Sequence, residues 1–344
     1  MRRALVLVAL TTMSACARGG DPNLDLDARQ ALLDAFDTYR AVGGMNASQG
    51  IGQVNDFILS LIEDPRFPEK VTDIAIECGN ALYQGTLDRY TSGEEVPLAE
   101  IRKVWRNTTQ IECGFSPLNE RLIPLVRRIN SRLPPEKWLR VLACDPPIDW
   151  DKVRSMDDLA PFMDRDASIS AVIEKEVFQK QGRKVLLILG INHVKHGLDT
   201  AVDRYEQHGY ANATFVIAAH VGFGNHTPLA QQNDLLEAKM ASWPVPSLVK
   251  LEGSWLAQLD PALFNEEAAP GQLGYPRVDA YLYVGRRDDL LTDGRSAKAV
   301  LDQDYIAELR RRADAVSAPP DAPRRPENVF RDELQSGPFH YGTQ

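Results

Sequence analysis

The chain has 344 residues, of which 44% are hydrophobic and 25% charged, a composition typical of an ordinary globular protein. Its 48 acidic residues outnumber its 39 lysines and arginines and give a formal net charge of -9. Because a chain with this balance lacks the positive charge that attracts phosphate backbones, we expect no nucleic-acid partner.

The first sixteen residues have the features of an export signal. Arg2 and Arg3 precede an apolar stretch, Ala4 to Leu10, which is too short to span a bilayer. The following Met13-Ser14-Ala15-Cys16 resembles the cleavage and acylation site of a bacterial lipoprotein. We therefore expect residues 1–16 to be a signal peptide with a lipobox and Cys16 to carry a lipid anchor. This places the protein in the bacterial cell envelope, on the periplasmic side of a membrane; ordinary cleavage to a free periplasmic protein is the alternative.

Residues 21–317 alternate between apolar runs typical of buried strands and amphipathic helical patterns. Strands are expected at Ala41 to Gly44, Thr72 to Glu77, Leu139 to Cys144, Val185 to Gly190, Thr214 to Ala219 and Asp279 to Val284. Helices are expected at Leu26 to Arg40, Gln53 to Ile62, Leu118 to Arg132, Ile169 to Gln181 and Asp304 to Ala313. This alternation predicts a single α/β domain with a mostly parallel central sheet covered by helices. The proline-rich residues 318–344 are expected to form an extended tail.

Three cysteines follow Cys16, namely Cys78, Cys113 and Cys144. An odd number without a CxxC spacing argues against a disulfide framework and against a structural zinc site. Cys78 and Cys144 each lie beside an acidic residue at the end of an expected strand, so a bridge between them is conceivable in an oxidising compartment. Buried free thiols are the commoner arrangement, and the pairing stays open.

Four of the expected strands end at residues that can carry chemistry. Gly190-Ile-Asn-His193 directly follows the run Val185 to Leu189, and Glu77, Asp145 and His220 close three other strands. Because the carboxyl ends of parallel strands meet at one edge of a sheet, we expect these side chains to converge there. Burial of a carboxylate in such a place costs free energy, so an acid there usually has a partner or a functional role. The simpler interpretation is that the two acids cap helices or hold loops and that His193 is a structural histidine.

Four segments resemble an uncharacterised bacterial group that is itself similar to the erythromycin esterase, ChaN and Tiki superfamily. They are Ile76-Glu-Cys-Gly-Asn-Ala-Leu-Tyr-Gln84, Trp105 to Thr109, Arg140 to Trp150 and Gly190 to His193. The resemblance extends from about Ala41 to Val284. It implies an α/β sheet with two strand-end Gly-x-x-His motifs and a glutamate between them. In hydrolytic members these residues activate water or bind a metal, whereas the related fold of ChaN-like lipoproteins binds haem.

One motif of the pair is incomplete in this chain. The second motif matches Gly190 and His193, and the glutamate matches Glu77, but the first motif has Gly43 with Asn46 in the histidine position. An asparagine cannot take a proton near neutral pH and is a poor zinc ligand. Residual chemistry would therefore use His193 as the base, with Asp145 or Glu77 orienting its ring. Asn46 would then donate a hydrogen bond to a developing oxyanion.

Three functions follow from these residues. We favour an exported lipoprotein with a hydrolase-like site for ester bonds, built on Glu77, Asp145, His193 and Asn46. The reason is that Glu77, Asp145 and His193 lie on separate strand ends. A lipoprotein that binds haem or another small molecule without turnover is the alternative, with Tyr83 and His193 as candidate ligands. If a divalent metal is held instead, His193 and Glu77 are its candidate ligands. A pseudoenzyme with an interaction role is the third hypothesis, in which the acids serve as loop anchors.

Overall fold

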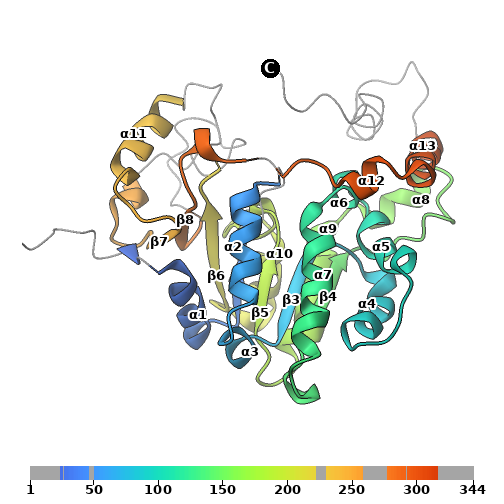
Figure 1. Ribbon diagram of the computed structural model, residues 1–344, viewed down its shortest axis with the longest axis horizontal. Helices are drawn as coiled ribbons and strands as arrows, with labels where there is room; N and C mark the ends of the chain where they lie inside the picture. The colour runs from blue at the N-terminus through green and yellow to red at the C-terminus, as the bar shows by residue number, and fades with distance from the viewer. Residues whose placement is uncertain are drawn as a thin grey trace, which may run out of the picture.

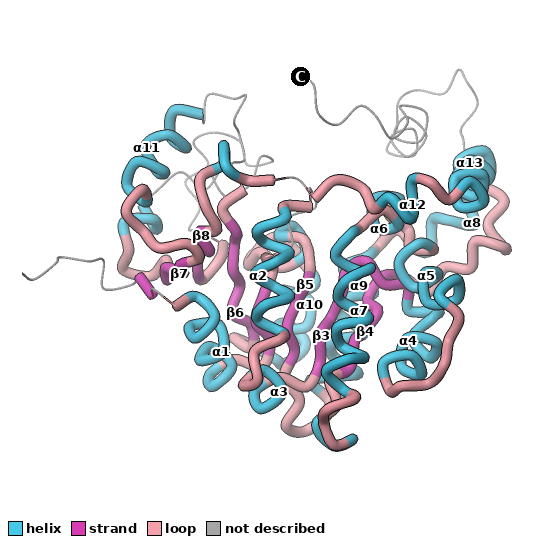
Figure 2. The backbone as a smooth tube through the Cα atoms, viewed as in Figure 1, coloured by secondary structure: helices cyan, strands magenta, loops and turns pink. Residues whose placement is uncertain are grey.

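The computed structural model describes residues 24–25, 27–45, 50–221, 230–258, 277–291 and 293–316. An eight-stranded sheet crosses the middle of the molecule (Figure 2) in the order β1-β7-β8-β6-β2-β5-β3-β4. In chain order its strands are β1 (Leu24–Asp25), β2 (Ala41–Gly43), β3 (Asp73–Asn80), β4 (Arg140–Asp145), β5 (Val185–Ile188), β6 (Thr214–Ala219), β7 (Ser247–Lys250) and β8 (Ala280–Tyr283). The six strands from β8 to β4 in this order are parallel, whereas β7 runs antiparallel to both of its neighbours.

Helices cover both faces of this sheet (Figure 1). On one face lie α1 (Ala28–Thr38), α2 (Gly52–Ile62), α3 (Phe67–Lys70), α4 (Gln84–Thr91), α5 (Leu98–Arg106) and α7 (Pro117–Asn130). On the other lie α9 (Arg165–Ile173), α10 (Ala201–Tyr205) and α11 (Ala230–Met240). Side chains alternate between the faces along each strand: Ile74 and Ile76 pack in the first core, and Ala75 packs in the second.

Four further helices lie near the end of the sheet that β4 forms. They are α6 (Ile111–Gly114), α8 (Met156–Leu159), α12 (Ala297–Val300) and α13 (Gln303–Val316). From α13, Arg312 donates to the Arg106 carbonyl at 2.8 Å and to Asn107 Oδ1 at 2.6 Å. Helix α13 therefore holds the turn that follows α5. No helix among the described residues is long and apolar enough to cross a membrane.

The predicted α/β fold with a mostly parallel, helix-covered sheet is confirmed, and all six expected strands are present. The strand expected to end at Glu77 instead continues to Asn80. Asn80 pairs with Asp145 of β4, and its side-chain amide donates to the Ile148 carbonyl at 2.8 Å, which prolongs the strand. Glu77 therefore lies within β3, next to an irregularity in the pairing between Ile76 and Asn80.

A disulfide joins Cys78 of β3 to Cys113 of α6, and Cys144 is a buried free thiol. The pairing that the sequence left open is therefore Cys78 with Cys113, and a bridge between Cys78 and Cys144 is excluded. Cys144 packs in the second core, whereas Cys113 lies in α6, which contacts β3. The bridge ties the strand that carries Glu77 to the segment that follows α5.

We expect reduction of this disulfide to lower the free energy of unfolding by roughly 2–4 kcal/mol, because the bridge closes a loop of 35 residues in the unfolded chain. Urea unfolding with and without a phosphine reductant measures the change. The matched control is the double variant Cys78→Ala, Cys113→Ala, whose stability should not respond to the reductant. An unchanged midpoint in wild type, with mass spectrometry showing full reduction, would contradict the prediction.

Candidate functional site at the carboxyl edge of the sheet

Three of the four candidate residues come together around an arginine that the sequence did not single out. Neighbouring strands β4, β3 and β5 bring Asp145, Glu77 and His193 to the same edge of the sheet. Arg165, the first residue of α9, lies among them with its side chain 10% exposed. Its Nε donates to Asp145 Oδ1 at 2.7 Å and its Nη1 to Glu77 Oε1 at 3.3 Å. A buried guanidinium needs such counter-ions, because desolvation of a lone charge is costly.

Asp145 is the more deeply buried partner of Arg165, with no exposed side-chain surface. Thr109 binds the same carboxylate twice, through its backbone N–H at 2.6 Å and its hydroxyl at 2.9 Å. Burial raises the pKa of Asp145, while Arg165 and the Thr109 N–H oppose that rise. Three donors are directed at the Asp145 carboxyl group, which accepts a hydrogen bond from each of them. Asp145 therefore anchors Arg165 and the turn after α5.

Glu77 connects the arginine to the loop that carries His193. Its Oε2 accepts a hydrogen bond from the Gly190 N–H at 2.5 Å, and its Oε1 lies 3.6 Å from His193 Nε2. A Cβ atom on residue 190 would come within 2.9 Å of Glu77 Oε2, so a side chain there would displace the carboxylate from this position. Burial raises the pKa of Glu77, but His193, Arg165 and the Gly190 N–H outweigh it and hold the pKa well below its usual range.

His193 lies in the 3-10 turn Ile191–His193 after β5, with 15% of its side chain exposed. Its Nδ1 is 2.9 Å from Asp166 Oδ1, and the same oxygen accepts from the Ala201 N–H at the start of α10. Its Nε2 is 3.2 Å from Arg165 Nη1. Burial lowers the pKa of His193, but the hydrogen bonds to Asp166 and Glu77 raise it to about 9.

The two protonation states of the His193 ring use different neighbours. Because an arginine only donates, its contact with Nε2 is a hydrogen bond only in the neutral ring with the proton on Nδ1. A protonated ring instead directs its Nε2–H toward Glu77 and is repelled by Arg165. His193 can therefore exchange a proton at Nε2 while Asp166 holds Nδ1.

The carboxylate on His193 differs from the one expected. We expected Asp145 or Glu77 to orient the ring, whereas Asp166 binds Nδ1 and Asp145 binds Arg165 and Thr109. The sequence contained signals for the missed residues. Asp164 caps α9, which places Arg165 and Asp166 in its first turn, and Thr109 closes one of the four segments that carried the family resemblance. A buried arginine at a helix start has no pattern of its own, so only the fold identifies it.

His220 follows β6, which β2 separates from β5, and has a network of its own. It is fully buried, with Nδ1 2.6 Å from the Tyr281 hydroxyl and Nε2 2.8 Å from Glu237 Oε1. Both ring nitrogens are therefore engaged away from Arg165 and His193. The expected convergence of all four candidates is thus only partly right, since β2 intervenes before His220.

The remaining predicted residues are placed differently or not described. Asn46 and Cys16 lie outside the described residues. Tyr83 packs against the first core and accepts from Asn107 Nδ2 at 2.9 Å, whereas Val194, next to His193, packs in the second core. The hydrogen bonds of Tyr83 and His193 are thus made with different residues.

The chemistry of Glu77 and His193 does not fit a divalent metal. The Nη1 of Arg165 lies 3.3 Å from Glu77 Oε1 and 3.2 Å from His193 Nε2, where a bridging cation would have to bind. A fixed positive charge in that place repels a metal ion. Within the described part of the chain, no group of three or more histidine, cysteine, aspartate or glutamate side chains could hold one.

Fold and site together define an α/β protein with a histidine–aspartate pair and a buried arginine at the carboxyl edge of a parallel sheet. No protein-family model matches the sequence, and no curated protein matches it either. Two solved structures are similar to the chain. One, a protein from Bacillus cereus, is 10% identical with a TM-score of 0.45, over 74% of this chain and 90% of that one.

The other is a mutant of the erythromycin esterase EreC in its open conformation. It is 13% identical with a TM-score of 0.48, over 77% of this chain and 94% of that one. The motifs predicted a similarity to erythromycin esterases, and one of the two similar structures is of such an enzyme. At this identity the likeness concerns the fold alone.

Proposed function

We propose that the protein is a hydrolase that cleaves ester bonds, with His193 as the group that moves the proton. The observation that carries this proposal is the arrangement of the ring: Asp166 holds Nδ1 at 2.9 Å, and Nε2 is left beside the Arg165 guanidinium. A carboxylate on Nδ1 fixes the tautomer and leaves Nε2 as the basic atom.

In the proposed reaction His193 Nε2 releases its hydrogen bond from Arg165 and takes a proton from a water molecule, which attacks the ester carbonyl carbon. The carbonyl oxygen becomes an oxyanion, for which the amide of Asn46 is the proposed donor. When the intermediate collapses, the bond to the alcohol oxygen breaks and the imidazolium returns its proton to that oxygen. Arg165, 3.2 Å from Nε2, destabilises the imidazolium and so favours this second transfer.

A panel of p-nitrophenyl esters, unactivated esters and lactones, followed in a pH-stat between pH 7 and pH 10, tests the proposal. We expect hydrolysis of at least one ester above the buffer rate, in proportion to enzyme concentration. Absence of turnover for every ester and lactone up to pH 10 would contradict it. Amides with the same acyl groups are the matched controls for reaction class, since amines are poorer leaving groups.

The pH profile gives a second test. Since the pKa of His193 is raised to about 9, only roughly one ring in a hundred is neutral at pH 7. The rate should therefore rise about tenfold per pH unit and level off above pH 9. Asp166→Asn removes a carboxylate that raises the pKa of His193. The rising part of the pH–rate profile should therefore move toward the ordinary histidine pKa of about 6.5. The plateau should also fall, because the ring is less firmly oriented. If the rates of wild type and of Asp166→Asn rise over the same pH range, Asp166 does not act through His193.

A further inference from the structure

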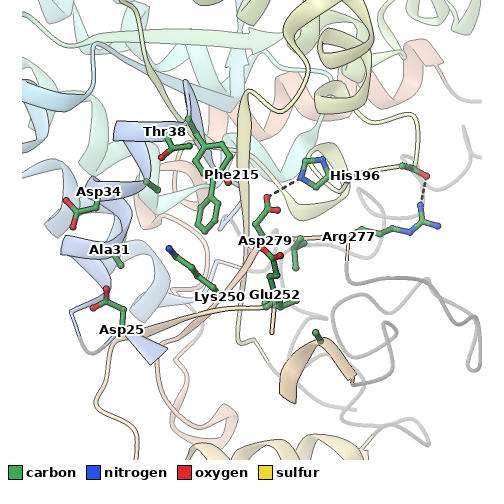
Figure 3. A pocket seen from close by; sticks show the side chains of 16 residues that line it. Asp25, Ala31, Asp34, Thr38, His196, Phe215, Lys250, Glu252, Arg277 and Asp279 are labelled. Atoms are coloured by element: carbon green, nitrogen blue, oxygen red, sulfur yellow. Dashed lines mark hydrogen bonds and ion pairs between the residues drawn. The ribbon is translucent and has the colours of Figure 1, made fainter. Parts of the chain in front are cut away.

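A cavity of about 930 Å³ lies outside the site described above, between α1, the start of β6 and the segment that leads into β8 (Figure 3). Neither Glu77, Arg165 nor His193 lines it. Its volume suits a small organic ligand. The loop after His193 reaches it only through His196 and Gly197. The cavity is therefore separate from the proposed site of ester hydrolysis.

One wall of the cavity is aromatic and apolar. The Tyr39 and Phe215 rings lie 5.2 Å apart between centroids, and Ala31 and Ala35 of α1 line the same cavity. Phe215 is buried, whereas Tyr39 is half-buried. Such a wall offers the flat body of a ligand dispersion contacts and offers a cation nearby aromatic rings.

Carboxylates lie close to these rings. Asp279 and Glu252 line the same cavity as Tyr39. Burial raises the pKa of the Tyr39 phenol, and the charges of these two acids raise it further. Asp279 Oδ2 accepts from the Val216 N–H at 2.7 Å and lies 3.2 Å from His196 Nε2, and Figure 3 shows this pair at the wall. Glu252 is exposed at the turn after β7.

The balance of charge around the cavity is acidic. Four carboxylates line it, against three basic side chains even when His196 is counted as charged: Asp25, Asp34, Glu252 and Asp279 against Lys250, Arg277 and His196. Two of the basic groups are engaged within the protein, since Arg277 donates to the Gly197 carbonyl and His196 pairs with Asp279. With His196 charged, the lining carries four negative and three positive groups, a formal charge of -1, and this excess favours a positive ligand.

We propose that this cavity binds a small amphiphilic amine, with its ammonium group at Asp279 and Glu252 and its apolar body against Tyr39 and Phe215. The ammonium group then lies at carboxylates, and the apolar body lies against aromatic rings. A neutral analogue gains only the contacts with the rings, and an anionic one meets the carboxylates.

Isothermal titration calorimetry with three probes of one shape tests the proposal: 2-phenylethylamine, 2-phenylethanol and phenylacetate, at low salt. We expect saturable one-to-one binding of the amine, and binding of the alcohol and the acid at least about tenfold weaker. Equal affinity for amine and alcohol, tighter binding of phenylacetate, or no saturable binding of the amine would overturn the proposal.

Two conservative variants locate the binding. Glu252→Gln alters an exposed side chain, and Asp279→Asn keeps a carbonyl oxygen that can accept from the Val216 N–H, so both should fold. Each should weaken amine binding by about fivefold, in line with a partly exposed ion pair. The control Glu136→Gln removes an exposed glutamate elsewhere and should leave the affinity unchanged. Amine binding that survives both cavity variants, or that falls equally in the control, would place the ligand elsewhere.

Discussion

The His193→Gln variant is expected to lower kcat/KM for ester hydrolysis by about 10²–10⁴-fold, the usual contribution of a positioned general base. Glutamine keeps a polar side chain in the 3-10 turn, and its amide N–H can still donate to Asp166, which binds the histidine ring at 2.9 Å. It cannot take up a proton near neutral pH. The variant therefore separates proton transfer from the structural role of the contact. Initial rates at pH 10, one unit above the His193 pKa of about 9, give the clearest comparison because the wild-type ring is largely neutral there.

A histidine outside the site supplies the control. His208 has 63% of its side chain exposed and lies 2.9 Å from Glu174 through Nδ1, so it also pairs with a carboxylate. His208→Gln should leave the rate within about twofold of wild type. Full activity in His193→Gln, with an unchanged unfolding midpoint, would show that the reaction does not use this ring. An equal loss in both variants would point to a general effect of the substitution.

The central sheet was predictable because its strands are buried on both faces. Val185 to Leu189 is apolar without interruption, which marks a strand covered by helices. The antiparallel strand β7 was not predicted, since Ser247–Lys250 is only four residues long and follows a proline-rich stretch. Helices α4 and α5 were missed because their apolar faces, such as Ile101, Val104 and Trp105, are short and lie among charged residues.

The site was only partly predictable, because strand ends specify an edge of the sheet and not the contacts made there. Glu77, Asp145 and His193 follow from their positions after buried runs. Their mutual arrangement depends on Arg165 and Asp166, which enter from a helix on one face. Nothing in the strand pattern indicates which carboxylate meets the ring and which meets the guanidinium. The choice of Asp166 over Asp145 is a consequence of where α9 begins.

The structure also gives the two acids a role that fits the third hypothesis, in which they act as anchors. Glu77 and Asp145 are counter-ions of one arginine, and each also accepts hydrogen bonds from a loop backbone, at Gly190 and Thr109. Such contacts contribute to stability whether or not the protein is an enzyme. The rate and stability effects of variants at these positions therefore have to be measured separately.

Replacing Arg165 with methionine is expected to lower the free energy of unfolding by about 3–5 kcal/mol, the usual cost of leaving a buried charge without its partner. The guanidinium is 10% exposed, and it neutralises Asp145, which is fully buried, as well as Glu77, which is 13% exposed. Methionine fills much of the same volume, so the loss should come from charge rather than from a cavity. Urea unfolding followed by circular dichroism measures it.

The decisive comparison also replaces Glu77 and Asp145 by their neutral amides. Arg165→Met leaves the Glu77 and Asp145 carboxylates without their positive partner. The triple variant Arg165→Met, Glu77→Gln, Asp145→Asn replaces both carboxylates by neutral amides and should therefore recover more than half of the lost stability. Arg128→Met removes an arginine whose side chain is 52% exposed and which pairs with Glu63, so its cost should stay below about 1 kcal/mol. If Arg165→Met costs no more than Arg128→Met, or if the triple variant is no more stable than the single one, charge compensation does not hold this edge of the sheet together.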